Sequence, residues 1–92
     1  MWFDQLDIKA ATRIANALSR LGQGNLSEVK GVGGGVLERR VDFGPGYRIY
    51  FGRDGERIVI LLAGGTKARQ PRDIEDAQTR WRNYKARKRS EA

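Results

Sequence analysis

The stretch Gly44–Gln70, GPGYRIYFGRDGERIVILLAGGTKARQ, predicts two β-strands joined by a turn at Asp54-Gly55. An Asp-Gly pair between alternating apolar runs is a strong hairpin signal, because both central positions of the tight turn take positive φ. We expect one face of the hairpin to form the core. With Arg53 and Glu56 flanking the turn, the cross-strand pairs on that face are Phe51–Ile58, Ile49–Ile60 and Tyr47–Leu62.

The second strand of this hairpin, residues 58–63, is apolar on both faces. Such a strand is typical of the interior of a sheet with both faces covered, so we do not expect it at an edge. A further strand is predicted upstream over 36–43, where apolar and charged residues alternate and Arg39 interrupts the apolar side. The three strands form one antiparallel meander in this prediction, near 36–43, 47–53 and 57–64.

Closing the upstream strand through the Gly-Pro-Gly turn at 44–46 places Arg40 near Tyr50 and Asp42 near Arg48, on the face away from the core. The simplest interpretation of Asp42 and Arg48 is a cross-strand ion pair worth under ~1 kcal/mol. The loop after the hairpin adds two cations, so a basic and aromatic cluster gathers on an open face of the sheet. Its members are Arg40, Arg48, Tyr50, Lys67 and Arg69.

Helical patterns precede the strands. A helix is predicted over 8–21, with Asp7 as its N-cap. Its buried stripe is expected to be Ala11, Ile14, Leu18 and Leu21. Residues 23–35 are expected to be a loop. The chain opens on apolar residues that are expected to end an earlier amphipathic helix whose beginning is missing: Trp2, Phe3 and Leu6.

A last helix is predicted from about 71 to 86, because Pro71 suits a first helical turn and acidic residues follow it. Apolar residues recur along it at helical spacing: Ile74, Ala77, Trp81 and Tyr84. We interpret this face as the one that docks on the sheet, and the alternative is a platform on which bases stack. The run 85–89 lacks an apolar stripe and is expected to fray, as part of a basic tail over 85–92.

The composition limits the function classes. A chain of 92 residues is expected to form a single domain over 1–92. Cysteine and histidine are both absent, which excludes disulfides, a cysteine nucleophile, a histidine base and Cys/His metal sites, and fits a reducing cytoplasm. No cofactor or metal is expected. No apolar run approaches the length of a membrane span, and no signal peptide is recognised, so no membrane partner is expected.

The formal charge of +7 is concentrated near the end of the chain, since residues 66–92 hold nine Lys and Arg against four Asp and Glu. Such a basic segment predicts a polyanionic partner, meaning nucleic acid, a ribosome or an acidic protein. The alternative interpretation is a solvated helical tail. Charge alone does not decide between the two.

Two motifs together resemble one family. Gly-Pro-Gly-Tyr-Arg-Ile-Tyr-Phe at 44–51 and Leu-Leu-Ala-Gly-Gly-Thr-Lys at 61–67, followed by Gln70, Asp73-Ile74 and Ala77, resemble the HigB-like addiction-module killer branch of the RelE/ParE toxin superfamily. The likeness extends from Phe3 to about Trp81. It implies an α+β domain in which a helical hairpin and a C-terminal helix pack on a curled antiparallel sheet. It also implies a bacterial type II toxin that cuts mRNA in the ribosomal A site, and a cognate antitoxin encoded beside it.

The family domain normally starts with a β-strand, and this sequence starts inside the helical hairpin, so one strand of the sheet is expected to be missing. A sheet that lacks a strand exposes unpaired backbone groups, which predicts self-association or an added strand from a partner. Arg39 also stands where the family pattern usually has leucine.

The resemblance implies the roles of individual residues. Arg48 corresponds to the arginine that contacts the scissile phosphate, and Arg40 and Lys67 correspond to two further basic positions of the catalytic site. Fixed cations can stabilise the phosphorane formed during RNA cleavage, and Lys67 is the candidate proton-transfer group because arginine stays protonated. Further RNA contacts are expected from Tyr50, Arg69, Arg87, Lys88 and Arg89.

Two other functions remain open at this point. One is a ParE-like toxin that binds DNA gyrase and cuts nothing, since that branch shares the fold and the basic character. The other is a truncated toxin that only binds its antitoxin. The cluster of Arg40, Arg48 and Lys67 favours the nuclease over the gyrase inhibitor.

Overall fold

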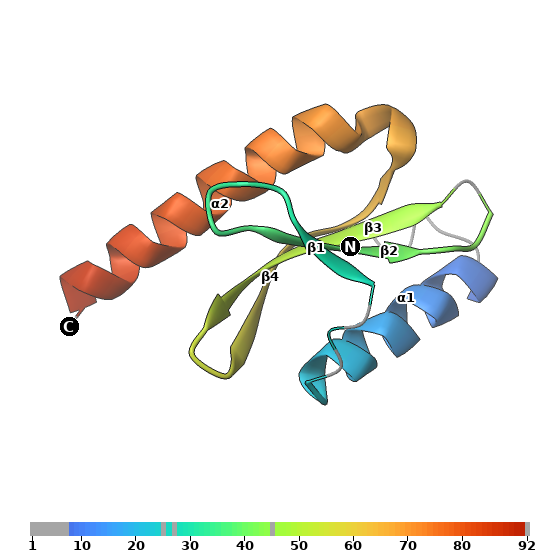
Figure 1. Ribbon diagram of the computed structural model, residues 1–92, viewed down its shortest axis with the longest axis horizontal. Coiled ribbons are helices and arrows are strands. Elements are labelled where there is room, and N and C mark those ends of the chain that lie inside the picture. Colours follow the sequence, from blue (N-terminus) through green and yellow to red (C-terminus); the bar gives the residue numbers. More distant parts are fainter. Residues whose placement is uncertain (1–7, 25, 27, 45, 92) are drawn as a thin grey trace.

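A computed structural model describes residues 8–24, 26, 28–44 and 46–91. Four strands form one antiparallel sheet in the order β1-β2-β3-β4, and the sheet curls between two helices (Figure 1). The α+β class is therefore confirmed, as is the antiparallel meander. The elements are α1 (Ile8–Gly22), β1 (Val29–Gly31), β2 (Leu37–Val41), β3 (Tyr47–Asp54), β4 (Arg57–Thr66), the 3-10 helix η2 (Lys67–Arg69) and α2 (Gln70–Glu91).

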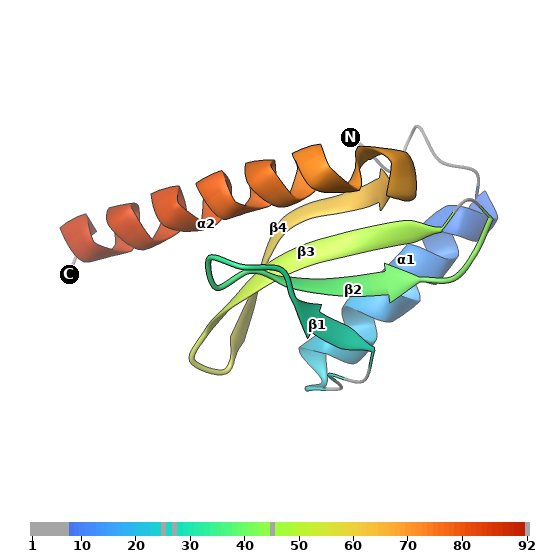
Figure 2. The ribbon, with the colours of Figure 1, turned by 45° about the horizontal axis from the view of Figure 1, so that its top comes forward.

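The two helices lie on opposite faces of the sheet (Figure 2). On one face, Ile14 and Leu21 of α1 pack with Ile49 and Phe51 of β3. On the other face, Ala77 and Trp81 of α2 form a second cluster with Val36, Tyr50 and Leu61. Alternating residues of β3 thus serve two cores. Neither helix is long and apolar enough to cross a membrane, within the part of the chain that the structure describes.

Helix α1 occupies the predicted span, but its buried stripe is rotated. The buried residues are Ala10, Ile14, Ala17 and Leu21, while Ala11 and Leu18 are half-buried. Ala17 packs with the strand residues of the core, and its small side chain lets the helix lie close to the sheet. The predicted N-cap Asp7 and the helix expected to end at Trp2, Phe3 and Leu6 lie outside the described residues.

The predicted loop at 23–35 contains a strand. In β1, Val29 lies opposite Arg39 and Gly31 opposite Leu37. Gly33, Gly34 and Gly35 then turn the chain into β2 with φ angles of 95°, 65° and 82°. The expectation of a loop was wrong for 29–31, because three residues are too few to show alternation.

The β3–β4 hairpin forms with a different register from the one expected. Asp54 lies opposite Arg57, so the turn residues are Gly55 and Glu56, and Phe51 lies opposite Ile60. The register shifts twice further along the hairpin. A β-bulge produces such a shift by adding one residue to one strand, and the hydrophobic pattern does not reveal it. The pairs Phe51–Ile58, Ile49–Ile60 and Tyr47–Leu62 were therefore wrong.

Strand β4 was expected inside the sheet, but it is an edge of the sheet formed by the described residues. Its apolar residues do serve both faces, since Ile58 and Ala63 pack toward α1 while Val59 and Leu61 pack toward α2. Ile60 is left 44% exposed. Helices on both faces explain the two-sided apolar pattern without a further strand beside β4.

The β2–β3 register also differs from the prediction. Arg40 lies opposite Arg48, and Glu38 lies opposite Tyr50. The connection runs from Val41 to Tyr47, and so is longer than a tight Gly-Pro-Gly turn. Asp42 consequently pairs with Arg40 at 3.3 Å, and the expected Asp42–Arg48 ion pair is replaced by one between Arg48 and Glu38.

Helix α2 covers the sheet face that was expected to be open. Ala77 and Trp81 are buried there, and Ile74 and Tyr84 are half-buried against the same cluster, so the predicted docking face is confirmed. Trp81 lies directly on Gly52 of β3, where an added Cβ would be 2.5 Å from Cε3 of the indole ring.

The same helix continues to Glu91, beyond the predicted end near 86. Lys88 contacts Asp54 at the β3–β4 turn, and the Lys85 ammonium lies 5.5 Å from the Trp81 ring centroid. Lys88 thus reaches back to the sheet from the last turns of the helix, and basic residues of good helix propensity are compatible with the longer helix.

Candidate phosphate-binding site

Three of the predicted site residues line one hollow of about 420 Å³ at the end of the sheet. Arg40 comes from β2, Arg48 from β3 and Lys67 from η2. Arg48 lies opposite both Arg40 and Gly65, and Lys67 follows Gly65 by two residues, so the three cations converge. We call this the Arg48 hollow. Its lining residues are Arg40, Asp42, Phe43, Gly44, Gly46, Arg48 and Lys67.

Arg48 is the least exposed cation of the hollow. Only 8% of its side chain is exposed, and its Nε and Nη1 atoms have no hydrogen-bond partner among the described residues. A buried donor without an acceptor costs roughly 1–3 kcal/mol, and more when it belongs to a charged group. An oxyanion in the hollow would supply the missing acceptors.

The carboxylate of Glu38 lies beside Arg48. Its Oε2 is 3.8 Å from Arg48 Nε and accepts a hydrogen bond from Gln70 Nε2 at 2.8 Å, and its Oε1 is 3.5 Å from Lys30 Nζ. Glu38, Lys30 and Arg48 also line an adjoining hollow of about 330 Å³. We did not single out Glu38 in the sequence. The available signal was its position two residues before Arg40, on the same face of the strand.

Tyr50 was expected on an open face and is fully buried beneath α2. Burial, and then the nearby Glu38 carboxylate, raise the pKa of its hydroxyl above the ordinary value. The hydroxyl has no hydrogen-bond partner among the described residues. Its ring therefore belongs to the core beneath α2, and the expectation that Tyr50 contacts RNA from an open face is corrected.

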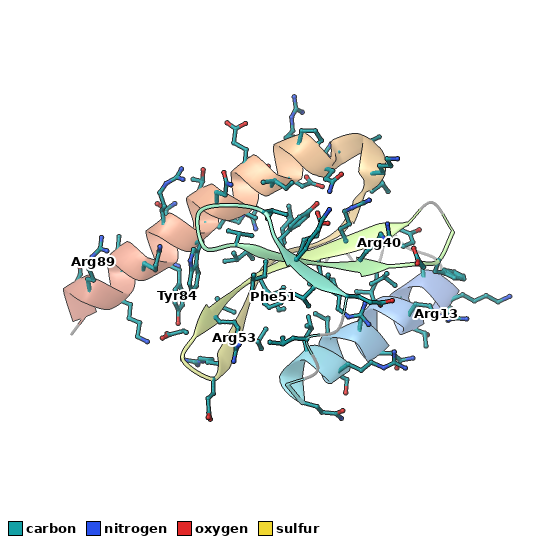
Figure 3. All side chains as sticks on the ribbon, viewed as in Figure 1. Arg13, Arg40, Phe51, Arg53, Tyr84 and Arg89 are labelled. Atoms are coloured by element: carbon teal, nitrogen blue, oxygen red, sulfur yellow. The ribbon has the colours of Figure 1, made fainter. Side chains whose placement is uncertain are left out.

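The other predicted RNA contacts do not join the Arg48 hollow. Arg69 is exposed and pairs with the buried Asp73 at 3.6 Å. Arg87 lines a groove between β4 and α2, whereas Lys88 and Arg89 line a hollow beside the β3–β4 turn. Figure 3 places Arg89 at the opposite end of the molecule from Arg40.

The charges in the Arg48 hollow are unequally compensated. Arg40 pairs with Asp42, whereas Lys67 is exposed and makes no ion pair with any described residue. Three cations and one carboxylate thus face one space, an arrangement suited to a phosphate group. Among the described residues, no three His, Cys, Asp or Glu side chains gather closely enough to hold a metal ion.

Comparisons with known proteins identify the family. A family model described as "Phage derived protein Gp49-like (DUF891)" matches residues 1–85. An uncharacterized protein of Haemophilus influenzae is 38% identical over 78 residues, which cover 84% of this chain and 79% of the relative. No solved structure matches the chain. The Gp49-like family is associated with toxin–antitoxin systems and RelE-like toxins, which agrees with the resemblance at that level. The chain belongs to the phage-derived, Gp49-like family.

Proposed function

We propose that the chain is the toxin of a bacterial toxin–antitoxin pair, of the HigB-like kind, and that it cuts mRNA on the ribosome. The observation that carries the proposal is the convergence of Arg40, Arg48 and Lys67 on one hollow, in which two buried donors of Arg48 lack acceptors. Membership of a toxin–antitoxin-associated family supports the general class. The cation cluster supports RNA cleavage in particular.

In the proposed reaction the RNA 2′-oxygen attacks the adjacent phosphorus, and the bond from phosphorus to the 5′-oxygen breaks. The phosphate oxygens accept hydrogen bonds from Arg48 Nε and Nη1, and Arg40 adds positive charge, so the phosphorane is stabilised more than the ground state. Lys67 gives a proton to the departing 5′-oxygen. Asp42, the carboxylate among the lining residues, takes the proton of the 2′-hydroxyl.

The proposed partners are the ribosome, its mRNA and a cognate antitoxin. A carboxylate offered to Arg48 would satisfy the same donors as a phosphate. The antitoxin is therefore expected to place an acidic side chain in or over the Arg48 hollow. Self-association through β4, an edge strand of the sheet that the described residues form, remains a separate prediction, supported by the 44% exposure of Ile60.

Primer extension on mRNA from cells that express the chain, with and without the gene beside its own, tests the proposal. The parent should leave cuts inside translated messages, and Arg48→Ala should reduce the cutting rate on the order of 10²–10³, as loss of one oxyanion donor does. Circular dichroism of Arg48→Ala, and of the more conservative Arg48→Lys, shows whether each variant keeps the fold. Arg72→Ala, at an exposed position of α2, is the matched control.

Two results would overturn the proposal. One is cleavage by folded Arg48→Ala at the parent rate. The other is growth arrest with stalled replication while every message stays intact, which is the behaviour of a gyrase inhibitor.

A further inference from the structure

A second basic hollow, of about 170 Å³, lies between α1 and β2. We call it the α1 hollow. It shares Arg40 and Asp42 with the Arg48 hollow, so the two spaces adjoin. Figure 3 shows Arg13 of α1 and Arg40 of β2 on the same side of the molecule. The charged lining residues are Arg13, Arg20, Arg39, Arg40, Glu28 and Asp42.

The ion pairs decide which of these charges are available. Glu28 pairs with Arg39 at 3.2 Å, and Arg39 also donates a hydrogen bond to the Arg40 carbonyl at 2.7 Å. Asp42 pairs with Arg40 at 3.3 Å. Both carboxylates are thus already offset by a cation. The unmatched positive charge of the α1 hollow belongs to the two arginines of α1.

Arg13 and Arg20 are exposed, and neither makes an ion pair with a described residue. They are seven residues apart, which is two helical turns, so they project from one face of α1 about 10 Å apart along its axis. The Arg13 guanidinium lies 5.3 Å from the ring centroid of Phe43, and Phe43 lines the Arg48 hollow. Arg13 and Arg20 therefore extend the positively charged surface from the Arg48 hollow along α1.

We propose that Arg13 and Arg20, with Arg40, form a second phosphate-binding subsite that holds the RNA backbone beside the scissile phosphate. The proposal rests on the proposed function and names a binding surface for the same substrate. Guanidinium groups bind phosphate through paired hydrogen bonds, and such backbone contacts position a strand without reading its bases. The subsite sets where the RNA lies, while the Arg48 hollow carries the chemistry.

The first test measures binding without cleavage. The probe is a short fluorescent 2′-O-methyl RNA oligonucleotide, which cannot be cut, titrated by anisotropy over a series of salt concentrations. Arg13→Gln with Arg20→Gln should weaken binding and reduce the slope of log K against log salt by about 1.4, the value for two lost single-strand phosphate contacts. Lys9→Gln with Arg72→Gln removes the same charge from exposed positions outside both hollows. Equal loss in the two double variants, or no loss in either, would overturn the subsite.

The second test uses ribosomes programmed with mRNA, under single-turnover conditions. The Arg13/Arg20 double variant should need several-fold more protein for half-maximal rate and should keep the maximal rate, because the chemical groups are untouched. A loss on both probes supports the subsite on the bound strand. A loss on ribosomes alone would place these contacts on ribosomal RNA and overturn the subsite beside the scissile phosphate. If the parent binds RNA with the expected slope and never cuts, the proposed function fails while the subsite stands.

Discussion

Arg48 and Glu38 face each other from neighbouring strands, with Nε and Oε2 3.8 Å apart and more than nine-tenths of each side chain buried. That distance is too long for a hydrogen bond, and the Glu38 oxygen instead accepts one from Gln70 at 2.8 Å. The carboxylate therefore offsets the charge of Arg48 without occupying its donors. The guanidinium lies beside this carboxylate, and its Nε and Nη1 atoms are buried without a hydrogen-bond partner among the described residues.

Glu38→Gln should destabilise the fold, because it leaves the Arg48 charge buried with little compensation. Removing one partner of a buried ion pair costs roughly 3–5 kcal/mol of unfolding free energy. Because water can enter the adjoining hollow, we expect a cost near the lower end of this range. Lys30→Gln is the control, since Lys30 meets the same carboxylate from an exposed position and should cost under ~1 kcal/mol. Urea unfolding measures both changes. Equal losses would show that Glu38 does not compensate Arg48.

Gly52→Ala should loosen α2. A Cβ at this position would lie 2.5 Å from the Trp81 ring, so the helix has to move away from the sheet at a cost of about 1–3 kcal/mol. Thermal unfolding and tryptophan fluorescence report the change. Gly31→Ala in β1 meets no atom within 4 Å and should leave stability almost unchanged. A Gly52→Ala protein as stable as the parent would contradict the close contact of α2 with the sheet.

Much of the fold could be predicted from the spacing of apolar residues, which recur every second residue in the strands and every third or fourth residue in the helices. The strands β2 to β4 and the docking face Ile74, Ala77 and Trp81 were predicted, because each pattern spans several residues. β1 was not predicted, since three residues carry no period. The hairpin register was not predicted either, because the shifts within β3–β4 leave no mark in the order of apolar residues.

The candidate site was predicted in part. Arg40, Arg48 and Lys67 do converge, although the pairing that brings them together differs from the expected one. The burial of Tyr50 and Glu38 was missed because it depends on α2, whose Gln70 reaches Glu38 from a distant part of the chain. A local alternation shows which residues share a face. It does not show which helix covers that face.

The contact between Asp54 and α2 predicts a response to acid. The hydrogen bond from Lys88, and then the one from Tyr84, hold the pKa of Asp54 below its ordinary value of 3.8. Because the folded state lowers this pKa, the contact stabilises the fold above 3.8 and loses its effect as the pH falls through the lowered value. The stability difference between the parent and Lys88→Met should therefore shrink from about pH 5 to about pH 2.

Unfolding midpoints measured across this range test the prediction. Arg87→Met is a suitable control, because Arg87 lines the groove on the other side of α2 and not the hollow at Asp54. A Lys88→Met difference that stays constant with pH would mean that Lys88 stabilises α2 without the Asp54 carboxylate.

Binding of the antitoxin should weaken as the salt concentration rises, because a chain of charge +7 attracts an acidic partner and dissolved ions screen that attraction. Calorimetry at low and high salt measures the effect. Arg40→Gln, at the mouth of the Arg48 hollow, should reduce both the affinity and its salt dependence, whereas Arg72→Gln should change them little. Affinity that is independent of salt would place the antitoxin on an apolar surface instead.

The final prediction separates charge from proton transfer at Lys67. Lys67→Ala should slow cleavage of mRNA on the ribosome by a factor on the order of 10²–10³, comparable with the loss of Arg48. Lys67→Arg keeps the positive charge in the Arg48 hollow, but arginine holds its proton at every accessible pH. If Lys67 protonates the leaving oxygen, Lys67→Arg should remain slow and lose the part of the pH–rate profile that the parent owes to this group. Arg69→Ala is the control, because Arg69 is engaged with Asp73 and does not line the hollow. A Lys67→Arg variant with the parent's rate and pH profile would show that Lys67 acts through its charge alone.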